Sequence, residues 1–271
     1  MFRRLPATTN GSTDYHRTAA RESPIESLST LTIIYCCVVM IAAYAVRGSS
    51  GFGAAAALPL LALVLPLKIL VPAWTLIALA AGTALLGSDR NKIAWAEVLK
   101  LLPGTAIGIL VGLYVFTLLS SEALNRWVGG FVMAYGLYSL WTTFGFGRKP
   151  YLAPRVAALI SGIAGGMTGT VVGTMGSAFY AIYFDVIKLG KDSYRATMTA
   201  ILLTLSLGRG AGYFAVGEFG RDVLVITAFL FPAMLVGIFI GNRFHHGMSE
   251  TVFRRTVACA LAVSGAALLI K

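Results

Sequence analysis

Arg209 is the residue whose position most strongly suggests chemistry inside a membrane. It is the one charged residue in the run 196–217. Burying a cation in hydrocarbon costs about 2.5–3.5 kcal/mol on insertion scales, so such a residue usually faces a cavity or a partner. A guanidinium can hold an oxyanion through two parallel hydrogen bonds, and Gly208, Gly210 and Gly212 leave room beside it for a ligand. The alternatives are that Arg209 snorkels to the interface or pairs with a carboxylate.

Two glycine-rich segments, 48–53 and 173–177, predict breaks in apolar helices. A break frees backbone N–H groups at the start of the next helix, where the helix dipole is positive and can hold an anion. Nearby hydroxyl groups add further donors. The candidate substrate-binding residues are therefore Arg209, Arg47, Ser49, Ser50, Gly51, Gly53, Thr174, Gly176, Ser177 and Tyr180. Two alternatives stay open: the glycines serve only close helix packing, and Arg47 is an interfacial anchor.

Carboxylates are scarce in the apolar runs. Asp185, near Tyr180 and Tyr183, is the one candidate for proton coupling, whereas Glu97 and the other acidic residues are assigned to the tail or to loops. Export of an anion from a negative-inside cell is favoured by about 2.3 kcal/mol per charge per 100 mV, so export needs no coupling ion. The scarcity of buried carboxylates therefore favours export or facilitated exchange. The cysteines have no metal-ligand spacing, and we expect neither a metal site nor a cofactor.

The composition requires lipid as the solvent for most of the 271 residues. Hydrophobic residues make up 57% of the chain and charged residues 12%. A water-bounded core of this size could not hide so much apolar surface. The net charge of +11 is spread between the apolar runs instead of forming a patch, which argues against nucleic acid as a partner. The uncharged runs are 27–46, 48–67, 69–88, 101–121, 127–147, 156–184, 223–242 and 256–270.

Most of these runs have the length of a membrane-spanning helix, about 20 residues. The run 156–184 is too long for one span and is predicted to split near Gly173 into two short helices. We therefore predict an all-α polytopic membrane protein with eight to ten spans. Residues 1–26 are polar and without apolar period, which predicts a disordered tail.

The second half of the chain repeats motifs of the first. Pro103 is followed by Gly108 and Gly112, and Pro232 is followed at the same spacing by Gly237 and Gly241. Equivalent loops have opposite charge bias, because 89–100 is basic in the first half and 243–255 in the second. The positive-inside rule then predicts two inverted repeats of about five helices each, a transporter architecture. The expected divisions are the tail 1–26, repeat 27–147, basic loop 148–155 and repeat 156–271.

The ordered set of motifs resembles the sulfite exporter TauE/SafE family. The resemblance rests on the Gly51-Phe52-Gly53 segment, the stretch from Arg90 through Pro103 to Gly112, the glycine-rich element 162–177 and the final span with its loop, and it covers about 45–271. The chain departs from the family pattern at Ala54-Ala55 and at Met175. The resemblance implies an inner-membrane secondary transporter, chiefly an exporter, of small sulfur-containing anions such as sulfite or organosulfonates in bacteria. Its expected partners are this substrate, the lipid bilayer and, as one option, a second copy in a homodimer.

Two other classes of protein are alternatives to a transporter. Gly48-Ser49-Ser50-Gly51 matches the motif of intramembrane serine proteases, but that chemistry needs a histidine base on a neighbouring helix. His16 lies in the tail, and His245 and His246 lie in a basic loop. The second alternative is a membrane scaffold that transports nothing. Phosphate-loop, dinucleotide and zinc-hydrolase motifs are also absent, so a transporter without enzymatic activity is predicted.

Overall fold

The computed structural model describes residues 29–50, 57–87, 90–143, 153–243 and 261–270, and every element in these ranges is helical. The predicted tail 1–26 lies outside them. The described elements are α1 (Thr30–Ser50), α2 (Ala57–Ala62), α3 (Leu67–Leu86), the short 3-10 helix η2 (Arg90–Lys92), α4 (Trp95–Leu118), α5 (Ser121–Thr143), α6 (Pro154–Val171), α7 (Gly176–Val186), α8 (Lys191–Ala215), α9 (Arg221–Arg243) and a C-terminal helix, Leu261–Ile270.

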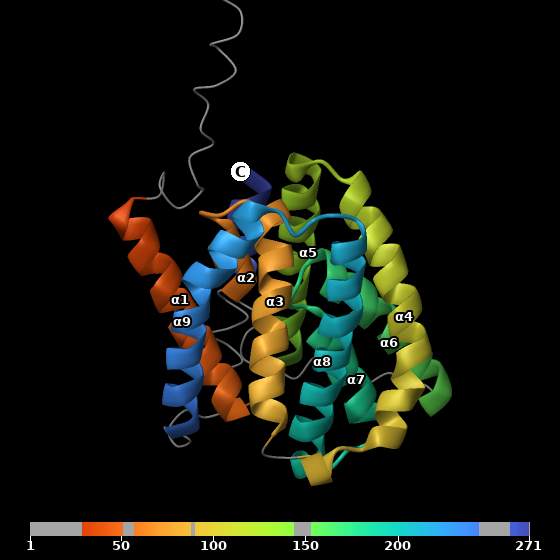
Figure 1. The fold of residues 1–271 in the computed structure, drawn as a ribbon. Helices are drawn as coiled ribbons and strands as arrows, with labels where there is room; N and C mark the ends of the chain where they lie inside the picture. The colour runs from red at the N-terminus through yellow and green to blue at the C-terminus, as the bar shows by residue number, and fades with distance from the viewer. Residues whose placement is uncertain (1–28, 51–56, 88–89, 144–152, 244–260, 271) are drawn as a thin grey trace, which may run out of the picture.

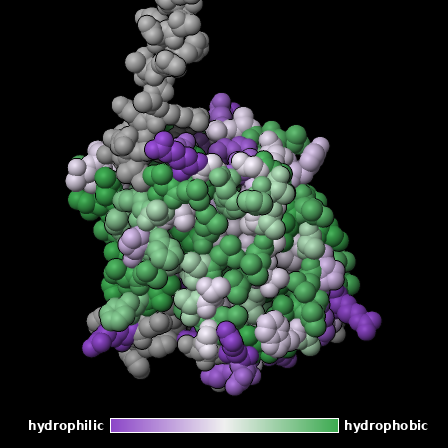
Figure 2. Space-filling model, in the orientation of Figure 1, coloured by the Kyte–Doolittle hydropathy of each residue, from purple (hydrophilic) through white to green (hydrophobic). Residues whose placement is uncertain are grey.

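The outer surface of the helical bundle is apolar. Four described helices, α1, α3, α4 and α9, are long and apolar enough to cross a membrane. Large apolar side chains point outward from them, and Leu110 of α4 and Phe239 of α9 are 68% and 66% exposed. Figure 2 shows the apolar surface as a broad band, with hydrophilic residues gathered at the two ends of the molecule. These observations confirm the predicted all-helical polytopic membrane protein.

The two halves of the bundle run in opposite directions. In Figure 1, α3 is joined to α4 through η2 at the bottom of the view, whereas the equivalent connection from α8 to α9 lies at the top. The contacts between helices are also exchanged between the halves. Helix α4 packs on α6, and its counterpart α9 packs on α1, while α3 and α8 lie side by side. The fold therefore contains the inverted repeat that the loop charges predicted.

Glycines create the same close helix contact in both halves. A Cβ atom on Gly108 would lie 2.3 Å from the Ile163 carbonyl oxygen, and a Cβ atom on its counterpart Gly237 would lie 2.7 Å from the Ile41 carbonyl oxygen. One turn later, Gly112 meets the Met167 carbonyl and Gly241 meets the Ala45 carbonyl in the same way. Because no side chain intervenes, the backbones of α4 and α6, and those of α9 and α1, approach closely.

Helices α6 and α7 form a hairpin inside the bundle. Helix α7 folds back against α6, since a Cβ atom on Gly176 would lie 2.5 Å from the Gly165 carbonyl oxygen. The turn between them includes Gly173, whose φ of 83° is strained for residues with a side chain. This confirms the predicted split of the run 156–184 near Gly173.

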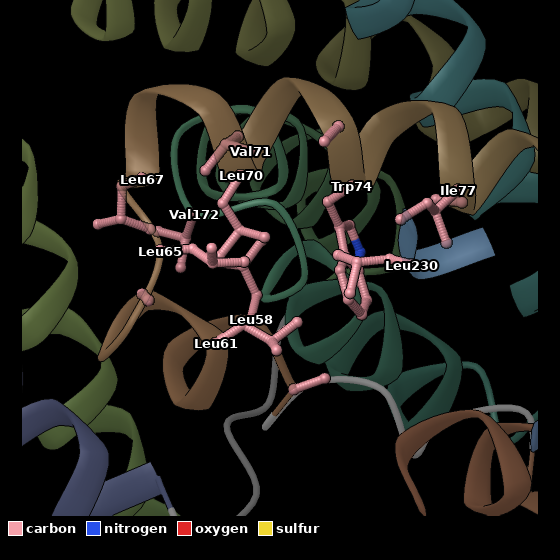
Figure 3. Packing of buried hydrophobic residues seen from close by; sticks show 14 of the residues in the cluster. Leu58, Leu61, Leu65, Leu67, Leu70, Val71, Trp74, Ile77, Val172 and Leu230 are labelled. Atoms are coloured by element: carbon pink, nitrogen blue, oxygen red, sulfur yellow. The ribbon is translucent and has the colours of Figure 1, made fainter. Parts of the chain in front are cut away.

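The turn of the hairpin is buried among side chains of the first half. Gly173 faces Leu58 of α2 and Trp74 of α3. Figure 3 shows Val172 of this turn packed near Leu65 and Leu70, with Trp74 further along α3. The turn is thereby held in the interior of the bundle, where the apolar cores of the two halves meet.

Candidate functional site

Arg209 is buried beside the turn of the hairpin. Its side chain is 1% exposed, and Nη1 donates hydrogen bonds to the carbonyl oxygens of Gly169 and Gly173, the latter at 2.6 Å. Gly169 lies in the last turn of α6, where the helix dipole is negative, and Gly173 lies in the turn that follows the helix. The snorkelling alternative is therefore wrong, and no carboxylate in the described part of the chain pairs with Arg209.

The Arg209 guanidinium retains unused binding capacity. Its Nε atom is buried and has no hydrogen-bond partner. The glycines on either side of Arg209 in the sequence do not leave free space beside its guanidinium group, however. A Cβ atom on Gly208 would lie 2.7 Å from Ile109, and one on Gly212 would lie 2.9 Å from Leu113, so both glycines accommodate side chains of α4. The prediction that these glycines leave room for a ligand was wrong.

Arg47 lies in the last turn of α1, within electrostatic range of Arg209. It is 7% exposed, and its guanidinium carbon lies 5.6 Å from the ring centroid of Tyr44, one helical turn earlier. Tyr44 is in electrostatic range of both guanidinium groups, and its buried hydroxyl interacts with Arg47 and has no other hydrogen-bond partner. Trp74 packs against the same ring, with the two centroids 5.7 Å apart. The interfacial-anchor interpretation of Arg47 does not fit this burial.

The turn of the hairpin supplies the start of α7. Thr174 lies in the turn, and the Ser177 hydroxyl donates a hydrogen bond to the Thr174 carbonyl at 3.2 Å. Gly176, the first residue of α7, packs against α6 as described above, which supports the packing interpretation for this glycine. In the first half, Ser49 and Ser50 are the last residues of α1, whereas Gly51 and Gly53 lie outside the described residues.

Two buried tyrosines of the second half line the surroundings of Arg209. Tyr180 shares a hydrogen bond of 3.1 Å with Thr105 of α4, and Tyr213 donates one of 2.5 Å to the Thr170 carbonyl. Both phenols are within electrostatic range of the Arg209 charge. Tyr180 was predicted from the sequence, whereas Tyr213 was not. Tyr44 was not predicted either, although it precedes Arg47 by three residues and therefore shares its helix face.

The burial of two carboxylates differs from what their sequence positions suggested. Asp185, the predicted proton-coupling residue, is exposed near the C-terminal end of α7. Glu97, which was assigned to a loop, lies in the first turn of α4 with its side chain 19% exposed. It accepts hydrogen bonds from Tyr183 at 2.5 Å and from Lys100 at 2.7 Å. The assignment of Glu97 to a loop was wrong, because the helix begins at Trp95.

The structure buries one arginine from each half of the chain. Arg47 and Arg209 are both within electrostatic range of Tyr44, and Arg209 hydrogen-bonds the turn where α6 ends and α7 begins. Inverted repeats with an interrupted helix at their interface are typical of secondary transporters. Over residues 36–268 the chain matches the family described as Sulfite exporter TauE/SafE, and it belongs to that family. It is a membrane transporter of sulfite or related sulfur compounds and not an enzyme. No curated protein and no solved structure matches the chain.

Proposed function

We propose that the chain exports a small sulfur oxyanion or organosulfonate across the bacterial inner membrane, and that the anion binds between Arg47 and Arg209. The observation that carries this proposal is the pair of buried guanidinium groups without a carboxylate partner among the described residues. The six residues 51–56 that follow α1 contain no carboxylate either. Two buried positive charges are costly in a membrane unless an anion offsets them.

The proposed site offers an anion several hydrogen-bond donors. Arg209 already uses Nη1 for the end of α6 and the turn after it, so its unpartnered Nε is a donor left for an anion. The Tyr44 hydroxyl can accept from Arg47 and still donate its own proton to the anion, and it lies in electrostatic range of both arginines. The backbone N–H groups at the start of α7, with Thr174 and Ser177, complete the proposed site from the second half. Ser49, Ser50, Gly51 and Gly53 are the corresponding candidates from the first half.

The direction of transport follows from the electrical gradient. An anion leaving a negative-inside cell gains about 2.3 kcal/mol per charge per 100 mV, so export needs no coupled proton. Asp185 is exposed, which removes the physical argument for a proton relay at that residue. We therefore propose export without proton coupling. The family assignment does not support the protease and scaffold alternatives, since the family consists of transporters.

The test is substrate affinity in three forms of residue 209. Arg209→Lys keeps the charge but loses the planar set of donors, so we expect weaker binding of labelled sulfite to the purified protein. Arg209→Gln loses the charge as well, and its binding should be weaker still. Arg126→Gln is the matched control, because Arg126 is 68% exposed and pairs only with Glu122 on the surface of α5.

Flux into or out of proteoliposomes should follow the same order as affinity. Thermal unfolding without substrate is measured in parallel, because Arg209 also holds the end of α6. Equal affinity in all three forms would remove Arg209 from the binding site. A loss of folded protein in Arg209→Lys with unchanged affinity in the folded fraction would assign Arg209 to the hairpin alone.

A further inference from the structure

The two ends of the helical bundle are built from defined helix termini. In Figure 1, the connection from α3 through η2 to α4 lies at one end and the connection from α8 to α9 lies at the other. Helix α6 runs parallel to α4, since Gly104 faces Gly162 and Gly108 faces Gly166 one turn later. We therefore define the η2 end by the starts of α4, α6 and α8 and the end of α9. The opposite end contains the starts of α3, α5 and α9.

Hydrogen bonds join helix termini at each of these ends. At the η2 end, the Ala94 N–H at the start of α4 donates to the Thr197 hydroxyl near the start of α8, at 3.0 Å. At the opposite end, Lys68 near the start of α3 donates to the Phe116 carbonyl near the end of α4, at 2.5 Å. The helix termini at each end therefore form one continuous surface.

The two ends differ in their basic residues. The connection from α3 to α4 contributes three cations to the η2 end, Arg90, Lys92 and Lys100. The other helix termini at the η2 end contribute five more: Arg155, Lys188, Lys191, Arg195 and Arg243. The described cations of the opposite end are Lys68, Arg126 and Arg221.

Acidic residues do not cancel this difference. In the described part of the chain, the η2 end carries Glu97, Asp185 and Asp192, and the opposite end carries Glu122, Glu218 and Asp222. Eight basic residues against three acidic ones leave an excess of five positive charges at the η2 end, whereas three against three leave none at the opposite end. Ion pairs within one end leave its excess unchanged.

The neighbouring sequence does not reverse the difference. In the short connections, Asp89 adds one negative charge before η2, and Arg148 and Lys149 add two positive charges between α5 and α6. Within the about 15–20 residues before a span that affect orientation, Arg17 and Arg21 precede α1. The η2 end keeps the larger number of cations when all of these are included.

We propose that the η2 end faces the cytoplasm and that its exposed cations bind the headgroups of anionic phospholipids in the inner leaflet. Loops with an excess of Lys and Arg stay on the cytoplasmic side of a membrane. The surface of that leaflet is negative, and juxtamembrane basic residues are attracted to it. This proposal is independent of the anion site, and it places the start of α1 on the outer side of the membrane.

The start of α4 presents the best-defined part of this lipid-binding surface. Arg90 and Lys92 are exposed on η2, and Lys100 has 52% of its side chain exposed. Trp95 and Leu99 lie one turn apart on the same helix face, and they are 54% and 62% exposed. Tryptophan favours the boundary between headgroups and acyl chains, so Trp95 and Leu99 contact the acyl chains while the cations reach the phosphates.

Cysteine labelling tests the orientation. Single cysteines replace Asn91 in η2 and Gly220 before α9, both exposed, in a protein without its native cysteines. A membrane-impermeant maleimide added to intact cells of a bacterial host should label the protein with cysteine at 220. The protein with cysteine at 91 should be labelled only after the cells are permeabilised. The reverse pattern would overturn the orientation and, with it, the assignment to the inner leaflet.

Tryptophan quenching by brominated lipids tests the lipid preference. One full-length reporter keeps Trp95 and the other keeps Trp127, which is 67% exposed near the start of α5 at the opposite end; the other exposed tryptophans become phenylalanine. Both reporters retain Trp74, which is 1% exposed and so adds the same background. The reporters are reconstituted with brominated phosphatidylglycerol or brominated phosphatidylcholine.

The two reporters should differ in their lipid preference. One uncompensated cation near the headgroups corresponds to about fivefold preference for the anionic lipid, so Trp95 should favour phosphatidylglycerol by about fivefold or more. Trp127, beside the paired Arg126 and Glu122, should show nearly equal quenching by the two lipids. Arg90→Gln combined with Lys92→Gln should reduce the preference at Trp95, and Arg126→Gln should leave it unchanged. Equal quenching of Trp95 by the two lipids, or an unchanged preference in the double variant, would overturn the lipid-binding surface.

Discussion

Gly108→Ala tests whether close contact between α4 and α6 stabilises the transporter. A Cβ atom at this position would lie 2.3 Å from the Ile163 carbonyl oxygen and 2.7 Å from the Met167 amide nitrogen, whereas ordinary contacts begin at 3.4 Å. Both neighbours are backbone atoms of α6, which cannot rotate away as a side chain would. The two helices must therefore separate by about 1 Å to admit one methyl group.

The expected loss of stability follows from two opposing effects. Overpacking costs about 1–3 kcal/mol, and the backbone neighbours place this contact at the upper end. Alanine is favoured over glycine within a helix by about 1 kcal/mol, which offsets part of the loss. The net destabilisation is about 2 kcal/mol, or roughly 4–8 °C in the unfolding midpoint of a protein of this size.

The assay is thermal unfolding of the purified protein in detergent, with Gly130→Ala as the matched control. A Cβ atom on Gly130 would meet only the flexible end of Leu269, at 3.8 Å, so this variant should keep or slightly raise the midpoint. Gly237→Ala, the counterpart of Gly108 in the inverted half, should lower the midpoint, since its Cβ atom would lie 2.7 Å from the Ile41 carbonyl oxygen. Equal midpoints for Gly108→Ala and Gly130→Ala would refute the argument.

Two further predictions concern orientation and the α4–α7 contact. Single cysteines at Asn91 and Gly220, in a background without the native cysteines, should label from opposite sides of the membrane, because the two connections lie at opposite ends of the bundle; labelling from one side would refute the inverted arrangement. Tyr183→Phe removes a hydrogen bond of 2.5 Å to the Glu97 carboxylate and should destabilise the protein by about 1–2 kcal/mol in thermal unfolding. Tyr138→Phe is its control, because Tyr138 is 55% exposed, and equal midpoints would show that the Tyr183 bond adds nothing.

The sequence alone was sufficient for the membrane class and for the repeat. A long uncharged run is expected to form a helix in lipid, because a helix satisfies its backbone hydrogen bonds internally. The spacing of Pro103, Gly108 and Gly112, repeated around Pro232, identified the internal repeat, and the structure shows that these glycines make the close helix contacts. Gly173 marked the turn of the hairpin, since a glycine amid an apolar run too long for one helix predicts a break.

Only the tertiary structure decided which polar residues meet. Arg209 stood out in the sequence because a single charge in an apolar run is visible without a partner, but its hydrogen bonds go to carbonyls of Gly169 and Gly173 some forty residues away. The part played by Tyr44 could not be read from composition, because a tyrosine in an apolar run is ordinary until its hydroxyl is found buried with no partner other than Arg47. The burial of Glu97 and the exposure of Asp185 could not be predicted for a related reason. Whether each carboxylate is buried depends on how helices α4 and α7 pack against their neighbours, and the local sequence around the carboxylate does not determine that packing.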